Sequence, residues 1–112
     1  MITRNYQTEE VRENPHHIDV RQLYSKPSAQ IMHISLKPGE SLKPHKTPVD
    51  VVFYVLEGTP TLHIGSESLV AAKDTLAESP ADLVHYISNS GTQVARIMVI
   101  KAPRPEQAAK VL

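Results

Sequence analysis

The sequence contains no cysteine and no tryptophan, and it has a single phenylalanine. Without thiols the chain cannot form disulfides, thiolate metal centres or cysteine nucleophiles, so any metal would be held by nitrogen and oxygen atoms. No apolar run approaches the roughly 20 residues that span a bilayer, and the first residues lack the apolar core of a signal peptide. We therefore expect a cytoplasmic protein without a membrane partner.

An excess of charge of one sign is also lacking. Lysine and arginine number 12, aspartate and glutamate number 12, and the basic residues are dispersed. No net field attracts nucleic acid or anionic lipid, so neither is an expected partner. At 112 residues the chain is long enough for one domain.

Apolar residues recur with a period of two along most of the chain, which is the pattern of β-strands. In 30–36, for example, Met32, Ile34 and Leu36 share one face while His33 lies on the other. The predicted strands are 18–24, 30–36, 49–56, 61–64, 67–71, 75–78, 83–88 and 94–101. The segment 49–56 is apolar on both faces apart from Asp50, which predicts a strand covered on both sides.

These short strands alternate with turn signals such as Lys37-Pro38-Gly39-Glu40 and Gly65-Ser66. No helical layer is indicated: 8–12 is a weak helix candidate, and 107–112 is predicted to form a helical turn or to be disordered. The pattern predicts an all-β, antiparallel sandwich or barrel. We expect a single domain over 1–112, with its core at about 17–102 and short extensions at both ends.

Two histidines, His45 and His85, are the main functional signal. Each opens or occupies a predicted strand with alternating neighbours, so each can face the inside of one β-structure. Two imidazoles inside an apolar barrel are costly to bury without a partner, and a metal or bound ligand is one such partner. We therefore expect the two side chains to share a pocket.

The segments around these histidines resemble the two sequence motifs of the cupin superfamily, whose members are small jelly-roll barrels. In the first segment five residues separate Gly39 from His45, and Gly58 closes it; the second contains Pro80, His85 and Asn89. The resemblance covers about 30–102, and the lead-in 14–24 is also similar to that of small single-barrel cupins. It implies an antiparallel jelly-roll barrel and a metal bound by three histidines and a glutamate.

The sequence departs from that ligand set at two positions. Thr47 stands at the second histidine position and Val51 at the glutamate position, so only His45 and His85 match. On one continuous strand, positions 45, 47 and 51 would point to the same face. Thr47 would then orient a bound water or substrate, and three residues would form an apolar wall: Val51, Phe53 and Val55.

A metal on His45 and His85 would be completed by water or by a third histidine, His63 or His33. Nitrogen ligands with open positions suit zinc, iron, nickel, manganese or copper better than calcium or magnesium. His63 shares a face with Thr61, so it is expected to face either solvent or a polar interior. The pair His16-His17 is expected to be a solvated lead-in.

Three hypotheses follow for the function. In the first, a metal-containing barrel polarises a small polar organic molecule or activates oxygen. In the second, the barrel binds or senses a small-molecule ligand without metal, and the histidines only form hydrogen bonds. In the third, the protein is mainly a structural homodimer that pairs through apolar strand faces such as 97–100.

No other catalytic pattern is present. The sequence has no glycine-rich phosphate loop, no Gly-x-Ser-x-Gly turn and no pair of carboxylates placed inside a predicted cleft. The sequence does not decide whether the protein is an enzyme. It also names no substrate, because one barrel fold serves many chemistries.

Overall fold

The structure, a computed structural model, describes residues 1–112 and consists of strands and turns. No helix is present that could cross a membrane. The strands are β1 (Asp19–Lys26), β2 (Ala29–Leu36), β3 (His45–Lys46), β4 (Val51–Glu57), β5 (Thr61–Ile64), β6 (Glu67–Val70), β7 (Leu76–Ser79), β8 (His85–Ser88), β9 (Ala95–Lys101) and β10 (Lys110–Val111).

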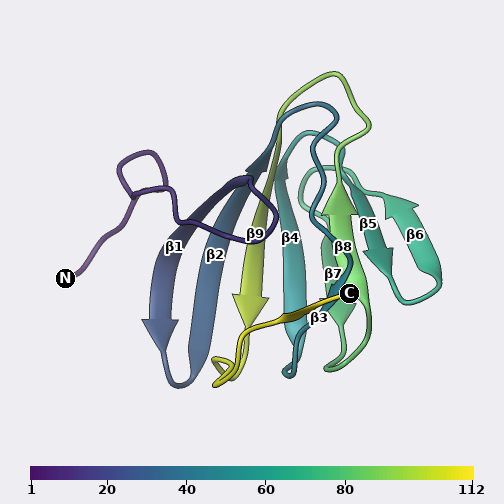
Figure 1. Cartoon of the computed structure of the whole chain (residues 1–112). Helices are drawn as coiled ribbons and strands as arrows, with labels where there is room; N and C mark the ends of the chain where they lie inside the picture. Colours follow the sequence, from purple (N-terminus) through teal and green to yellow (C-terminus); the bar gives the residue numbers. More distant parts are fainter.

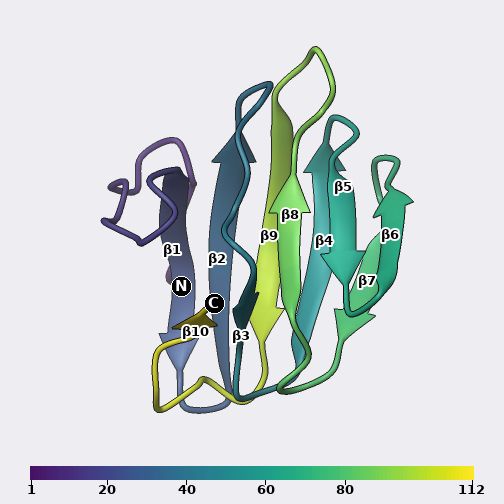
Figure 2. The same ribbon diagram turned by 45° about the vertical axis from the view of Figure 1, so that its right-hand side comes forward.

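The strands form two five-stranded sheets that face each other (Figures 1 and 2). The first sheet has the order β1-β2-β9-β4-β7, and the second has the order β10-β3-β8-β5-β6. Every strand pair is antiparallel. The predicted all-β antiparallel jelly roll is confirmed, although hydrogen bonds do not close the two sheets into a continuous barrel.

The core lies between the sheets and is built by alternation. Leu36, Val55, Ile87 and Ile97 are fully buried, with 0% of their surface exposed. In β2 the inward positions include Ile34 and Leu36, as the sequence predicted, while His33 points to the outer side of the sheet. Burial of one strand face against the opposite sheet is the main stabilising term.

The segment around Pro48 differs from the prediction. His45–Lys46 (β3) belongs to the second sheet, whereas β4 starts at Val51 in the first sheet. A continuous strand through 45–51, on which the three positions would share one face, is therefore not formed, because the chain crosses between the sheets over 47–50. Thr47 and Val51 are nevertheless both buried, with 1% and 2% exposure.

The sequence analysis predicted that the strand at 49–56 is covered on both sides, and this was wrong for β4. Val51, Phe53 and Val55 are buried, but Val52 and Tyr54 on the outer face of β4 are only half-buried. The reason is architectural: a second sheet packs on one face of the first sheet, and nothing comparable packs on the other.

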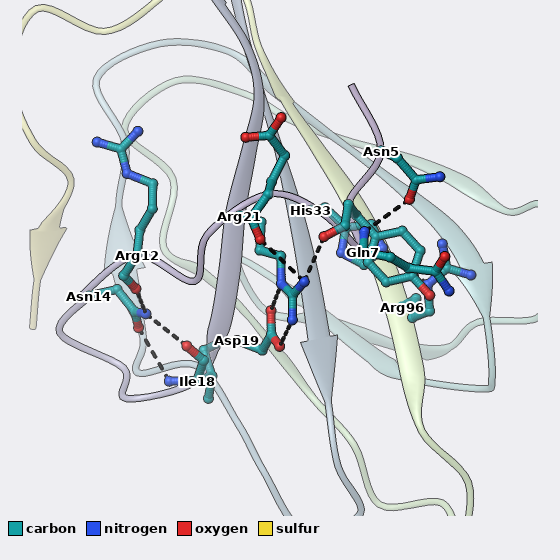
Figure 3. Close-up of polar contacts among 11 residues, drawn as sticks. Asn5, Gln7, Arg12, Asn14, Ile18, Asp19, Arg21, His33 and Arg96 are labelled. Atoms are coloured by element: carbon teal, nitrogen blue, oxygen red, sulfur yellow. Dashed lines mark hydrogen bonds and ion pairs between the residues drawn. The ribbon is translucent and has the colours of Figure 1, made fainter. Parts of the chain in front are cut away.

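The N-terminal segment, residues 1–13, runs along β1 and ends in a turn held by Asn14 (Figure 3). The guanidinium group of Arg21 donates to the carbonyl of Tyr6 at 2.6 Å and pairs with Asp19. The weak helix candidate at 8–12 forms no helix; the amide of Thr8 instead closes a turn onto the carbonyl of Asn5.

The C-terminal segment is a strand rather than the predicted helical turn or disordered tail. Strand β10 pairs with β3, so that Val111 lies opposite His45 (Figure 2). The amide of Leu112 donates a further hydrogen bond to the carbonyl of Pro44. Without β10, the outer edge of β3 would have unpaired backbone N–H and C=O groups, and this short pairing provides their hydrogen-bond partners.

Candidate ligand-binding site

The structure brings His45 and His85 together. They are direct partners in the antiparallel pairing of β3 with β8, and their ring centroids lie 4.6 Å apart in an edge-to-face arrangement. Both side chains are buried, with 7% and 2% exposure. Phe53 packs edge-to-face on His85 at 5.2 Å from the opposite sheet.

Two hydroxyl groups fix the ring of His85. Ser79 Oγ lies 2.7 Å from Nδ1, and Thr47 Oγ1 lies 3.2 Å from Nε2. A hydroxyl can donate or accept, so this pair satisfies a neutral imidazole in either tautomer. Burial, followed by the charges of His45 and Lys101, lowers the pKa of His85 to about 4. His85 is therefore neutral at pH 7.

The backbone of Lys43 orients two other imidazoles. His45 Nδ1 lies 2.7 Å from the Lys43 carbonyl, and the Lys43 amide donates to His16 Nδ1 at 2.8 Å. In the neutral rings these bonds leave the proton of His16 on Nε2 and a free acceptor at Nε2 of His45. Burial lowers the pKa of both histidines, that of His16 to about 4.

His16 is a site residue that the sequence analysis missed. We expected it to be solvated, but its ring lies 5.0 Å from that of His45. The turn held by Asn14, whose side chain bonds to the backbone on both sides of the histidine pair, places it there. An asparagine-proline pair before two histidines is a turn signal, and it could have indicated that the lead-in folds back.

These side chains line a cavity of about 380 Å³ between the sheets. Its polar residues include His16, His45, His85 and Lys101. The apolar wall comes mainly from the first sheet and comprises Val20, Met32, Ile34, Val51, Phe53 and Val99, with Leu42 from the segment before β3. The C-terminal segment from Pro105 to Val111 forms one side of the opening.

The other predicted pocket residues divide between this cavity and the core. Val51 and Phe53 line the cavity, whereas Thr47 does not line it but bonds to His85, which does. Val55 is fully buried in the core and does not line the cavity.

Neither candidate third ligand lies in the cavity. His33 is on the outer side of the first sheet, where it stacks on Tyr6 and accepts a hydrogen bond from Arg96. His63 is on the outer side of the second sheet, where it stacks on Tyr86 and bonds to two serines. The alternation of β2 and β5 turns both rings away from the interior.

Lys101 is the second cavity residue that the sequence analysis missed. It ends β9 two positions after the buried Val99, so strand alternation directs it inwards. The signal was present in the sequence, since a lysine at the inward position of an apolar strand is unusual. Burial lowers the pKa of Lys101.

Comparison with known proteins identifies the family. The family model described as the cupin domain matches residues 32–101. The chain belongs to the cupin family. Cupins bind small molecules and often metals, and the two motifs found in the sequence are those around His45 and His85.

Solved structures share the fold over most of the chain. The protein TT1209 of Thermus thermophilus is 27% identical, with a TM-score of 0.80 over 94% of this chain and 100% of that chain. A cupin of Methanocaldococcus jannaschii is 23% identical, with a TM-score of 0.74 over 88% and 92%. The polyketide cyclase RemF of Streptomyces resistomycificus is 17% identical, with a TM-score of 0.79 over 100% and 86%. No curated protein matches the chain.

The donor set of this cupin does not fit a firmly held transition metal. No group of three or more histidine, aspartate or glutamate side chains is placed to hold an ion. Both ring nitrogens of His85 are already bonded to hydroxyls, and the side chain of Val51 occupies the position where the motif has a carboxylate. Among the cavity histidines only Nε2 of His45 is a free acceptor, and one nitrogen is too few for such a site.

Proposed function

We propose that this cupin binds a small organic molecule in the cavity between its sheets, without requiring a metal. The observation that carries the proposal is the cavity itself, in which neutral imidazoles and a lysine lie beside an apolar wall contributed mainly by the first sheet. Concave sites of roughly 300–1,000 Å³ with apolar walls and a few convergent polar groups are typical of small-molecule binding. The proposal assigns no reaction to the protein.

A ligand screen in the presence of EDTA tests this proposal. Small organic acids, alcohols and sugars are added to the chelated protein, and the unfolding midpoint is measured. A ligand at ten times its Kd stabilises the folded state by about 1.4 kcal/mol, which corresponds to roughly 5 °C for a domain of this size. The proposal is abandoned if no compound stabilises the chelated protein, or if every stabilisation requires added metal.

Two histidine variants provide matched controls for the screen. His45→Ala removes a cavity imidazole and should reduce or abolish the ligand-induced shift. His63→Ala removes an imidazole from the outer side of the second sheet and should leave the shift unchanged. Equal effects of the two substitutions would place the ligand outside the cavity.

A metal held by His45 and His85 is the second candidate, and it requires Nε2 of His85 to exchange its bond to the Thr47 hydroxyl for the ion. The observation in its favour is that His45 lies 4.6 Å from His85 and 5.0 Å from His16, measured between ring centroids. Zinc, iron, nickel, manganese and copper are the candidate ions for such nitrogen donors. Metal analysis of the purified protein and of the His45→Ala, His85→Ala double variant separates the two candidates. Stoichiometric metal in the wild type that is lost from the double variant supports the metal site.

We also propose that the protein is a homodimer in the cytoplasm, with a small molecule and no nucleic acid or membrane as its partner. The dimer proposal is supported by the outer face of the first sheet, where Ile31, Val52, Met98 and Ile100 are half-buried neighbours. An apolar sheet face of this kind is typical of a contact with another protein surface.

A further inference from the structure

The cavity contains a lysine with no carboxylate partner. Lys101 lines the cavity at the inward end of β9, and no carboxylate oxygen lies within 4.0 Å of its ammonium group. The ion pairs of the chain are elsewhere, at Arg21–Asp19 and Arg96–Glu57. Glu13 and Glu106 also line the cavity, but both are exposed and neither forms a salt bridge with Lys101.

Strand register explains why the ammonium group is unpaired. Lys101 lies opposite Val51 on β4 and opposite Gln30 on β2. Position 51 is where the cupin motif has its glutamate, and a carboxylate there would be a cross-strand neighbour of Lys101. Neither neighbour can neutralise the charge, because valine is apolar and the glutamine amide is uncharged; the Gln30 amide nitrogen donates to Gln22.

The surrounding imidazoles do not compensate for the positive charge. His16 presents its Nε2 proton as a further donor, because its Nδ1 already accepts from the amide of Lys43. The charge of Lys101 also acts on all three cavity histidines and helps to keep them neutral, after the larger effect of burial. The polar part of the cavity therefore has cationic and donor groups that a bound anion would satisfy.

We propose that the ligand of this cavity is a small carboxylic acid, bound as its carboxylate by Lys101 with its hydrocarbon part against Met32, Ile34 and Phe53. This inference rests on the proposed function and names its ligand class. A half-buried ammonium group without a counter-ion is costly, and an incoming carboxylate removes that cost while forming a charge-assisted hydrogen bond. The volume of about 380 Å³ suits a small acid rather than a large one.

Three compounds with the same chain but different head groups test the inference: hexanoate, hexanamide and 1-hexanol. Each is titrated into the isotope-labelled protein with EDTA at pH 7.5, and binding is followed by the NMR signals of the cavity residues. We expect hexanoate to bind about tenfold tighter than the two neutral compounds, as a hydrogen bond to a charged group predicts. Hexanoate, but not 1-hexanol, should also raise the pKa of Lys101.

A pair of lysine variants assigns the preference to one residue. Lys101→Met keeps the length of the side chain but removes its charge, so it should abolish the preference for hexanoate while 1-hexanol still binds. Lys46→Met is the matched control, because Lys46 follows His45 on β3 and does not line the cavity. It should leave the preference intact.

Different failures have different meanings. Equal binding of hexanoate and 1-hexanol, or an unchanged preference in Lys101→Met, overturns the carboxylate inference and leaves the proposed small-molecule function standing. The inference is equally overturned if hexanoate does not bind while other compounds of the ligand screen do. If no compound of either set binds to the chelated protein, the proposed function itself fails.

Discussion

At the scale of single residues, His33 is the most deeply buried titratable side chain outside the cavity. Only 1% of its surface is exposed, and its Nδ1 atom has no hydrogen-bond partner. Tyr6 of the N-terminal segment stacks on the ring at 4.0 Å, and Arg96 donates to Nε2 at 3.0 Å. Burial, followed by the charge of Arg96, lowers the pKa of His33 to about 4.

The first prediction is that His33 makes the stability depend on pH. Between about pH 6.5 and pH 4 the unfolded chain binds a proton at this residue and the folded chain does not. The free energy of unfolding should therefore fall as the pH is lowered through this window, by up to about 3 kcal/mol from this group. Urea denaturation at a series of pH values measures the effect.

The control for this prediction compares two variants. His33→Gln cannot titrate and should make the slope between pH 6.5 and 4 smaller, even if it lowers stability at every pH. The remaining slope comes from His16 and His85, whose pKa values burial also lowers to about 4. Ile31→Val, on the same strand, removes no titrating group and should leave the slope unchanged. A wild-type slope retained in His33→Gln would assign the pH dependence to other groups.

The second prediction concerns the two positions at which the metal ligands are missing. Thr47→His together with Val51→Glu supplies an imidazole and a carboxylate beside His45 and His85, which completes a nitrogen and oxygen donor set. We expect this double variant to bind zinc or manganese stoichiometrically and much more tightly than the wild type. Calorimetric metal titration, with metal content after dialysis, measures this.

Placing the carboxylate on the other face of the same strand provides the control. Thr47→His with Val52→Glu has the same composition, but residue 52 points to the outer side of the first sheet. It should not gain the same affinity. Equal metal binding by both double variants would mean that the ion is held away from the cavity.

At the scale of the elements, the pairing of β10 with β3 decides how open the cavity is. Only two residue pairs and the hydrogen bond from Leu112 to Pro44 hold the C-terminal segment, yet it lines one side of the opening. So short a strand forms because β3 offers a free edge, and little apolar surface is buried by it, since Val111 is 36% exposed.

The third prediction is that removing residues 105–112 weakens ligand binding more than it weakens the fold. The truncated protein should lose about 1 kcal/mol or less of stability, because β10 adds few hydrogen bonds. Ligand should dissociate faster, and the amides of β3 should exchange faster with solvent. NMR hydrogen exchange and thermal melting measure the two effects; a loss of cooperative unfolding would show that the segment belongs to the core.

At the scale of the whole molecule, the first sheet has one face on the core and an outer face on which only the N-terminal segment packs, through Tyr6 on His33. Its outer face combines Ile31, Val52, Met98 and Ile100 in adjacent strands. The sequence analysis identified 97–100 as the strand segment for a dimer contact. The structure divides it: Ile97 and Val99 are buried inside, whereas Met98 and Ile100 lie on the outer face.

The fourth prediction is that this outer face forms the dimer. Light scattering of the wild type should give twice the 12.4 kDa of one chain. Met98→Glu places a charge in the middle of the face and should give monomers without unfolding the protein. Val70→Glu, at the exposed edge strand β6, is the control and should leave the dimer intact. A monomeric wild type at micromolar concentration contradicts the prediction.

The sequence by itself determined the class of fold and the two central histidines. The period of two in the apolar residues predicted strands close to those of the structure, because alternation alone decides which face of a strand can be buried. The motifs around His45 and His85 indicated the cupin family, and the family match over 32–101 confirms it. These signals are local, so one sequence is sufficient to read them.

The tertiary structure decided the composition of the cavity. His16 and Lys101 reach it from opposite ends of the sequence, and His33 and His63 are excluded from it because their strands turn them outwards. The crossing between the sheets at Pro48 could not be predicted either, because the alternation of side chains says nothing about where the chain leaves one strand for another sheet. Which residues share a cavity depends on how strands pair and sheets stack, and these contacts join positions that are distant in the sequence.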